Sequence, residues 1–417
     1  MSAVAHEATT PLPGRPWRIL ASGPFRSLWA AHLLTLLGES FSYVAMPWLV
    51  LQLTGSGLAV GTALALQGVP RTALMIVGGA IADRVSPRLA MLGSAAVRAL
   101  VMGLLAVLIL THAVQLWEVY VAALAVGTVS AFFLPARFAV LPGVVPEHQL
   151  EAGNALLNLN QQGSFVVGPA VAGVLIATTS TGAAFAVDAA AFALATALLL
   201  LVAVKPRPDA DQAPGDGSRS LLREIVDGLA YTWNDVGLRS VIALIAVVDF
   251  WYAGAMEVGL PVLTQQRFGQ GAAAFGSMVA AFGAGSTIGV IVSGLTRVPP
   301  RMGPLVIGVV SWLGVGLGLL GLAPNLVVAV SVAAATGVAT GAANTFGLTW
   351  LQRRTVDAML GRVMALVMLA SFGLAPVALA LAGLLAIQHV GLVFGVGAAM
   401  ILAAAVGGAL SRTVRSL

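Results

Sequence analysis

Long apolar runs separated by short polar turns dominate the chain from residue 26 onward. A run of about 20 apolar residues crosses the hydrocarbon core of a bilayer as an α-helix, whereas the strands of a membrane β-barrel would alternate apolar and polar residues. The pattern therefore predicts an all-α membrane protein with twelve spans. We expect these spans at 26–52, 57–82, 89–111, 117–136, 150–177, 182–204, 239–263, 272–295, 304–322, 326–350, 362–386 and 390–410.

One long polar segment, residues 205–238, divides the spans into two groups of six. We expect a cytoplasmic tail at 1–25, a six-helix bundle at 26–204, a cytoplasmic linker at 205–238, a second six-helix bundle at 239–410 and a cytoplasmic tail at 411–417. The halves also share a repeat, because the segments 84–88 and 297–301 both read Arg-Val-x-Pro-Arg. Two pseudo-symmetric bundles related by an axis along the membrane normal are typical of one class of secondary transporter.

The composition excludes several other classes of protein. With 59% hydrophobic residues, 9% charged residues and a mean hydropathy of +0.97, the chain cannot cover itself with a polar surface as a soluble globule does. The absence of cysteine excludes disulfides and thiolate chemistry. We find no cluster of metal ligands, no phosphate-binding loop and no Ser-His-acid spacing, and we therefore expect no metal, no cofactor and no enzymatic activity.

The positive net charge of +5 follows from membrane topology. If both termini lie in the cytoplasm, most of the 21 lysines and arginines fall in cytoplasmic segments, as the positive-inside rule requires. We therefore expect a multi-pass protein of a bacterial-type inner membrane with both termini cytoplasmic. The basic residues then need no nucleic acid partner, and we expect none.

The turn between the second and third spans contains Gly79, Asp83, Arg84 and Arg88. This segment resembles the signature loop between helices 2 and 3 of the major facilitator superfamily, although Ser86 stands where that family usually has a glycine. The resemblance implies the facilitator fold of two six-helix bundles. It also implies a conformational-switch loop, whose aspartate docks near the start of span 11 and holds the cytoplasmic side shut. The alternative is that the charges of the loop only set topology.

Other segments resemble the drug-exporter branch of this superfamily, which includes macrolide-efflux and enterobactin-exporter proteins. They include the run 133–137, Phe-Leu-Pro-Ala-Arg, and the pair Gly168-Pro169 in span 5. Gly168 and Pro169 are similar to the antiporter motif of that branch. The resemblance implies that spans 1, 4, 7 and 10 line a central cavity that opens alternately to either side.

Ionisable side chains inside the spans are candidates for the mechanism, because each costs roughly 2.5 to 3.5 kcal/mol by insertion scales unless it has a partner or a wet cavity. Glu39, Asp249, Glu257 and Arg71 are the proton-coupling candidates. Burial raises the pKa of a carboxyl and a nearby arginine lowers it, so such a group can exchange a proton as the cavity changes sides. The alternative is a fixed ion pair between Glu39 and Arg71.

Two further charged residues, Asp188 in span 6 and Arg98 in span 3, lie in spans that the resemblance places away from the cavity. We interpret them as a structural polar contact within the first bundle. Substrate should contact apolar and aromatic side chains with a few polar groups. The substrate-cavity candidates are Trp48, Phe132, Phe133, Trp251, Tyr252 and Asn344.

Together these features predict a monomeric secondary transporter that exports hydrophobic or amphipathic small molecules in exchange for protons. Its partners would be a small-molecule substrate, protons and the lipid bilayer. Alternatives are the export of a specific metabolite such as a siderophore, a lipid-translocating protein and a non-transporting membrane protein. Sodium is an alternative coupling ion, because carboxylates bind both ions.

Overall fold

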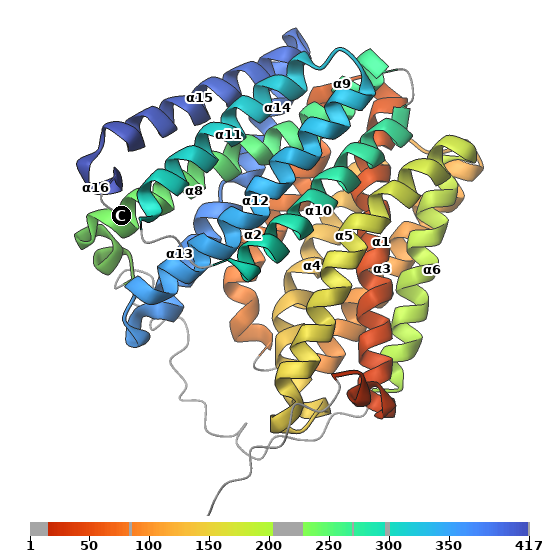
Figure 1. Ribbon diagram of the computed structural model, residues 1–417. Helices are drawn as coiled ribbons and strands as arrows, with labels where there is room; N and C mark the ends of the chain where they lie inside the picture. The colour runs from red at the N-terminus through yellow and green to blue at the C-terminus, as the bar shows by residue number, and fades with distance from the viewer. Residues whose placement is uncertain (1–15, 83–85, 203–227, 269–270, 297–300, 416–417) are drawn as a thin grey trace, which may run out of the picture.

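The computed structural model describes residues 16–82, 86–202, 228–268, 271–296 and 301–415, and within them the chain is helical. A short helix η1 (Pro16–Ala21) leads into the N-terminal bundle (Figure 1). The helices of this bundle are α1 (Gly23–Thr54), α2 (Gly57–Ala82), α3 (Pro87–Leu110), α4 (Leu116–Val144), α5 (Leu150–Thr178), preceded by η2 (Glu147–Gln149), and α6 (Thr181–Leu200).

The C-terminal bundle repeats this arrangement with two interrupted spans. Its first span consists of α8 (Val236–Gly254), a π-helical segment η4 (Ala255–Gly259), α9 (Leu260–Leu263) and a second π-helical segment η5 (Thr264–Phe268). The other helices are α10 (Gly271–Leu295), α11 (Met302–Leu322), α12 (Leu326–Arg354), α13 (Asp357–Phe372) with α14 (Ala375–Gln388), α15 (Val390–Leu410) and the short α16 (Arg412–Arg415).

The expected fold is confirmed. Eleven helical segments in the described ranges are long and apolar enough to cross a membrane, and α2, with 26 residues, completes two sets of six. Several helices extend past the predicted spans. For example, α4 reaches Val144 instead of residue 136, because a helix can continue into the polar region once it has crossed the hydrocarbon core. The break between α13 and α14 precedes Pro376, whose missing N–H favours the start of a new helix there.

Local sequence explains where several helices begin and end. Gly55 ends α1 with φ of 65°, a left-handed conformation that glycine adopts without steric cost. Asp235 begins α8, because its Oδ1 accepts hydrogen bonds from the backbone N–H groups of Gly237 (2.8 Å) and Leu238 (3.1 Å). Such caps fix the ends of the helices near the membrane surfaces.

The two bundles share one core at one end and have separate cores at the other. We call the end where η1 and α16 lie the terminal side and the opposite end the far side. A large core joins residues of both bundles, for example Val44 of α1 and Phe275 of α10. A second core, around Phe25, lies entirely in the N-terminal bundle, and a third, around Leu238, lies entirely in the C-terminal bundle. The bundles therefore meet in the far half of the molecule and diverge toward the terminal side (Figure 1).

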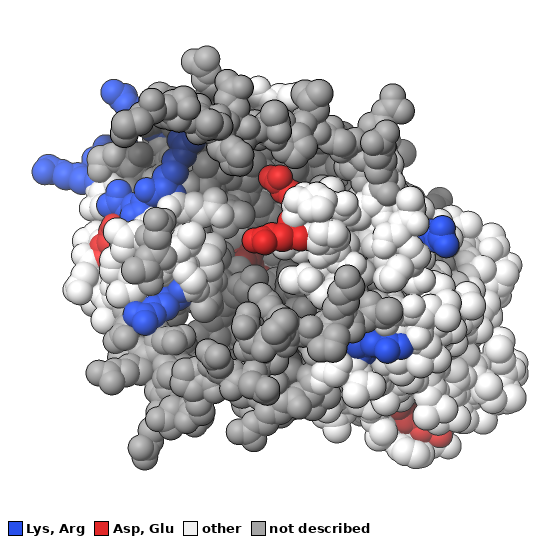
Figure 2. Space-filling view, turned by 90° about the horizontal axis from the view of Figure 1, so that it is seen from below, with Lys and Arg blue, Asp and Glu red and all other residues white. Residues whose placement is uncertain are grey.

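Small residues allow the bundles to approach closely on the far side, where α2 packs on α14 and α5 packs on α10. A Cβ atom built on Gly61 of α2 would lie 2.5 Å from the carbonyl oxygen of Leu379, and one built on Gly173 of α5 would lie 2.6 Å from that of Ala272. Only glycine fits at such contacts, as is common between membrane helices. In the view from below (Figure 2), acidic side chains stand near the middle of the terminal face.

Candidate functional site

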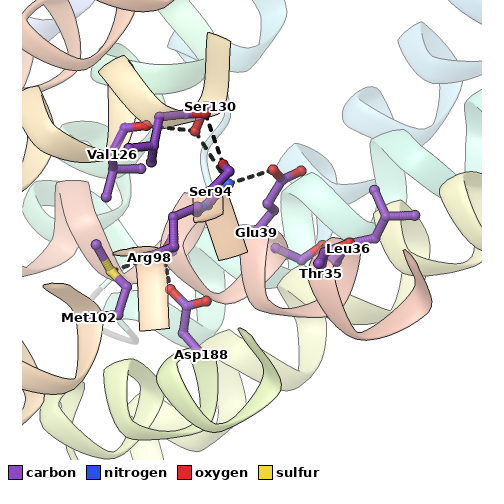
Figure 3. A network of polar contacts seen from close by, with 12 residues as sticks. Thr35, Leu36, Glu39, Ser94, Arg98, Met102, Val126, Ser130 and Asp188 are labelled. Atoms are coloured by element: carbon purple, nitrogen blue, oxygen red, sulfur yellow. Dashed lines mark hydrogen bonds and ion pairs between the residues drawn. The ribbon is translucent and has the colours of Figure 1, made fainter. Parts of the chain in front are cut away.

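A charged cluster occupies the middle of the N-terminal bundle (Figure 3). The Arg98 guanidinium of α3 donates through Nη1 to Glu39 Oε1 of α1 at 2.6 Å and to Ser130 Oγ of α4 at 3.4 Å. The Arg98 side chain is 5% exposed, whereas that of Glu39 is 43% exposed. The guanidinium therefore belongs to the protein interior, and the carboxylate that it binds is open to its surroundings.

A second carboxylate approaches Arg98 from α6. Asp188 is fully buried and accepts a hydrogen bond from the Ser42 hydroxyl of α1, while its Oδ1 has no hydrogen-bond partner in the described ranges. It interacts electrostatically with both Arg98 and Glu39. Figure 3 shows Arg98 with Asp188 on one side and Glu39 with Ser130 on the other. Arg98 thus forms an ion pair with one acid and interacts electrostatically with a second, and its guanidinium lies over the Phe192 ring at 4.2 Å. Arg137 of α4 also interacts electrostatically with Glu39.

The fixed pair between Glu39 and Arg71 does not form. Glu39 is paired with Arg98, and Arg71 is exposed on α2. Arg71 instead lies close enough to Glu257, in η4 of the other bundle, for an electrostatic interaction. Glu257 also interacts with Tyr43 of α1, whose ring stacks on that of Phe275 at 6.2 Å. Glu257 and Arg71 therefore lie where the two bundles meet.

Asp249 lies in the C-terminal bundle on a cavity of about 320 Å³. Ser371 of α13 is its hydrogen-bonding partner, and no arginine or lysine of the described ranges interacts with it electrostatically. Asn344 lines the same cavity from α12. The lining residues are Val241, Leu244, Ile245, Val248, Asp249, Met302, Leu305, Val306, Val309, Val310, Leu313, Thr340, Ala343, Asn344, Phe346, Gly347, Leu348, Leu351, Val367 and Ser371.

The aromatic candidates lie in packed positions around these sites. A Cβ atom built on Gly271 of α10 would lie 2.8 Å from the Trp48 ring, so Trp48 helps to close the far side. Trp251 faces Gly397 of α15, and the Tyr252 hydroxyl donates to the Leu313 carbonyl at 3.2 Å. On α4, Phe132 is half-buried, and Phe133 packs on the separate core of the N-terminal bundle.

The motif residues of span 5 lie at a junction of three helices. Gly168 packs directly on Ser40 of α1, and the Pro169 carbonyl faces Gly276 of α10. The motif thus lies where α5 touches its own bundle and the other one. Because each contact brings a backbone against a neighbouring helix, a larger side chain at Gly168 would force the helices apart.

The described part of the switch loop is Arg88. Its Nε and Nη2 donate to the carbonyl oxygens of Leu199 (3.1 Å) and Leu200 (2.6 Å) at the end of α6, where unpaired carbonyls attract a cation. Asp83 and Arg84 lie outside the described residues, and for Gly79 only its place in α2 is described. Within the described ranges, no group of three or more His, Asp or Glu side chains is arranged to hold a metal ion.

The sequence alone did not reveal the partner of Glu39 or the cavity beside Asp249. Matching the acidic and basic residues that lie deep in the same bundle could have identified the partner of Glu39. Arg98 is deep in the first bundle, as are the acids Glu39 and Asp188, so a shared guanidinium is the simplest pairing. No comparable signal marks the cavity, because its walls are ordinary apolar residues.

Comparisons with known proteins agree with this architecture. The chain is 26% identical to the multidrug efflux pump Tap of Mycolicibacterium fortuitum over 371 residues, which cover 87% of this chain and 89% of that protein. It is 26% identical to the enterobactin exporter EntS of Shigella boydii (81% and 79% covered) and 23% identical to the macrolide efflux protein A of Streptococcus pyogenes (72% and 73% covered).

Among solved structures, the nucleoside transporter NupG superposes with a TM-score of 0.73 at 12% identity, covering 92% of this chain and 98% of that one. At this level of identity the similarity concerns the fold alone. Residues 15–415 match the family model of the transmembrane secretion effectors, and the chain therefore belongs to this family of major facilitator transporters.

Proposed function

We propose that this protein exports hydrophobic or amphipathic small molecules in exchange for protons, by alternating access, as a monomer in a bacterial-type inner membrane. Both termini would be cytoplasmic, so the terminal side would face the cytoplasm and the structure would be open inward. The similarity to a multidrug efflux pump and to a macrolide efflux protein supports export of such substrates.

The arrangement of the cores is the observation that carries alternating access. Each bundle has its own core on the terminal side, and the two share a core only in the far half. Each bundle can therefore move as a unit if the far-side contacts open, such as the one between Gly61 and Leu379. Rocking of two rigid bundles about a shared contact is a known form of domain motion.

The pair of Glu39 and Arg98 supports proton coupling. Glu39 is half exposed, so a proton can reach its carboxylate, and its only ion-pair partner in the described ranges is Arg98. Protonation of Glu39 would weaken this pair and leave Arg98 to the second acid, Asp188, which already interacts with it. Arg98 can therefore pair either with Glu39 or, once Glu39 is protonated, with Asp188. A single proton would switch the protein between these two arrangements.

Export of an anionic metabolite such as a siderophore is the second candidate. The similarity to an enterobactin exporter favours it. So does Arg71, an exposed cation at the bundle interface whose charged neighbour is Glu257 on the opposite bundle. An anionic substrate would need such a cation, whereas a cationic substrate would not.

Proton movement in liposomes containing the purified protein tests the main proposal. We expect lipophilic cations or macrolides to drive proton movement in the wild type, and Glu39→Gln to reduce it at least tenfold. Glu151→Gln, the same change at an exposed position in the first turn of α5, is the matched control and should behave as wild type. Transport by the wild type that moved no protons would exclude proton coupling. Transport of catecholates alone, lost in Arg71→Gln, would favour the second candidate.

A further inference from the structure

We propose that the cavity in the C-terminal bundle is a binding site for an amphipathic organic cation, whose charged nitrogen pairs with Asp249. This inference rests on the proposed export function and adds the class of substrate and the place where it binds. It differs from the expected cavity between the bundles, because every residue that lines it belongs to α8, α11, α12 or α13.

The charge of Asp249 is the first argument. Four acids lie deep within the described spans: Glu39, Asp188, Asp249 and Glu257. Arginine interacts with three of them, Arg98 with the first two and Arg71 with Glu257. Among the described residues, the hydrogen-bonding partner of Asp249 is the Ser371 hydroxyl, and no arginine or lysine interacts with it. A carboxylate has about four sites that accept hydrogen bonds, so most of the accepting sites of Asp249 are unused. We infer that a bound cation occupies them.

The arginines of the surrounding helices do not supply that cation. Arg239, Arg301, Arg353, Arg354 and Arg362 all lie at the terminal ends of α8, α11, α12 and α13. Asp249 is ten residues beyond Arg239 along α8, which corresponds to about 15 Å. Two of these arginines also have partners of their own, since Arg239 lies over the Trp233 ring and Arg354 pairs with Asp235.

The shape and chemistry of the walls are the second argument. Residues at helical spacing form each wall, as in the row Thr340, Asn344, Leu348 and Leu351 on α12. Aliphatic side chains from α8 and α11 make up most of the rest, while Thr340, Asn344 and Ser371 supply polar groups. A volume of about 320 Å³ with mostly apolar walls and a few polar groups suits a small organic ligand. An inorganic ion would leave the apolar walls unfilled.

The cavity is also accessible. Asn344 and Leu348, both on its wall, are exposed, and Leu348 is 47% exposed. A ligand can therefore enter from the surface of α12. The cation site and the pair of Glu39 and Arg98 then lie in different bundles, so substrate and proton would bind at separate places.

Equilibrium binding to the full-length purified protein, without any ion gradient, tests the inference. The ligand is radiolabelled methyltriphenylphosphonium, a cation with no titratable proton. Triphenylphosphine oxide, which is neutral and similar in shape, is the comparison. We expect Asp249→Asn to weaken binding of the cation at least tenfold and to leave binding of the neutral molecule within twofold. Glu151→Gln should leave both within twofold.

A second variant fills the cavity without removing a charge. Gly347 lines it, and a Cβ atom built there meets no atom within 4 Å, so a larger side chain fits without moving the backbone. We expect Gly347→Phe to weaken binding of both ligands. The matched control is Gly395→Phe on α15, where a Cβ atom also meets nothing within 4 Å and the residue is exposed. It should bind both ligands as wild type does.

The outcomes separate this inference from the proposed function. The site would be overturned, even if export were proven, if Asp249→Asn bound the cation as tightly as wild type does. It would also be overturned if Glu39→Gln, and not Asp249→Asn, abolished binding of the cation. Loss of sodium binding alone in Asp249→Asn would also overturn it, since the site would then hold an inorganic ion. If Asp249→Asn lost binding of the cation but kept binding of the neutral molecule, the result would support the site. If the wild type then failed to transport the cation, export of the cation would be refuted while the site stood.

Discussion

The two bundles place acids at membrane depth in opposite ways. In the N-terminal bundle, Arg98 forms an ion pair with Glu39 and interacts electrostatically with Asp188, and Ser42 and Ser130 complete the cluster. In the C-terminal bundle, Asp249 has a single hydroxyl partner and an adjoining cavity. In the first arrangement the protein places a cation beside its acids, whereas the second leaves a negative charge with space beside it.

This difference suggests a division of labour. The cluster around Arg98 can change its internal pairing when one proton is added to the exposed Glu39 carboxylate. An acid beside a cavity can bind a ligand, but its desolvated charge lowers the stability of the fold when the cavity is empty. Changes that remove one arrangement while keeping the other test the comparison directly.

The largest effect is expected when Arg98 is replaced by Met. The change removes the ion-pair partner of Glu39 and the cation nearest to the fully buried Asp188, and a buried charge that loses its compensating charge is costly. We expect a strong fall in the thermal midpoint of the detergent-purified protein. Arg26→Met, at an exposed arginine near the start of α1, is the matched control and should change the midpoint little. The triple variant with Glu39→Gln and Asp188→Asn should recover most of the loss, and a stable Arg98→Met single variant would contradict the cluster.

The coupling between Glu39 and Arg98 should be the next largest effect. In a double-mutant cycle of Glu39→Gln and Arg98→Met, residues in one ion-pair network typically show an interaction energy of about 0.5–3 kcal/mol. We expect a value in the lower half of that range, because solvent can screen the exposed Glu39 side chain. The measurement is the unfolding free energy of the four proteins. Additive effects would mean that the contact contributes nothing.

A smaller effect of opposite sign is expected at Asp249. Asp249→Asn removes an uncompensated charge and keeps an oxygen that can accept from Ser371. We therefore expect the empty protein to gain up to about 1 kcal/mol, since an unpaired buried charge is costly. Thermal unfolding without ligand measures it. A marked loss of stability would show that Asp249 has a structural partner, and would remove the contrast between the bundles.

The smallest effect is expected at an exposed pair on the terminal side. Partial burial alone would raise the pKa of Asp235, but the hydrogen bond and charge of Arg354 and the N–H groups of Leu238 and Gly237 outweigh it, so the pKa is lowered. A lowered pKa stabilises the fold above the ordinary value of 3.8 and loses this contribution as the pH falls through the folded pKa.

Asp235→Asn isolates this charge, because asparagine is also a good N-cap. We expect the variant to lose less than about 1 kcal/mol at neutral pH, as exposed pairs contribute little. The difference from wild type should begin to shrink near pH 3.8 and disappear once the pH has fallen below the lowered pKa of Asp235, and it should also shrink at high salt. Thermal midpoints across this pH range measure it, and a difference that persisted in acid would assign the effect to the cap.

The sequence by itself determined the helical spans, their grouping into two sets of six and the superfamily. The physical reason is local. In lipid, each segment must satisfy its own backbone hydrogen bonds and cover itself with apolar side chains, so the span is recorded in consecutive residues. The loop motif from Gly79 to Arg88, together with the apolar spans on either side of it, indicated the superfamily, because all of these features are recorded in consecutive residues.

Only the tertiary structure decided which charges meet and where space remains. Arg98 lies 59 residues from Glu39, and Asp188 lies 146 residues from Ser42. These contacts depend on how each helix is rotated about its axis and on how far a long side chain reaches. Close packing of all the neighbouring helices sets both quantities. The cavity beside Asp249 has the same origin, because it is formed where four helices fail to fill the space between them.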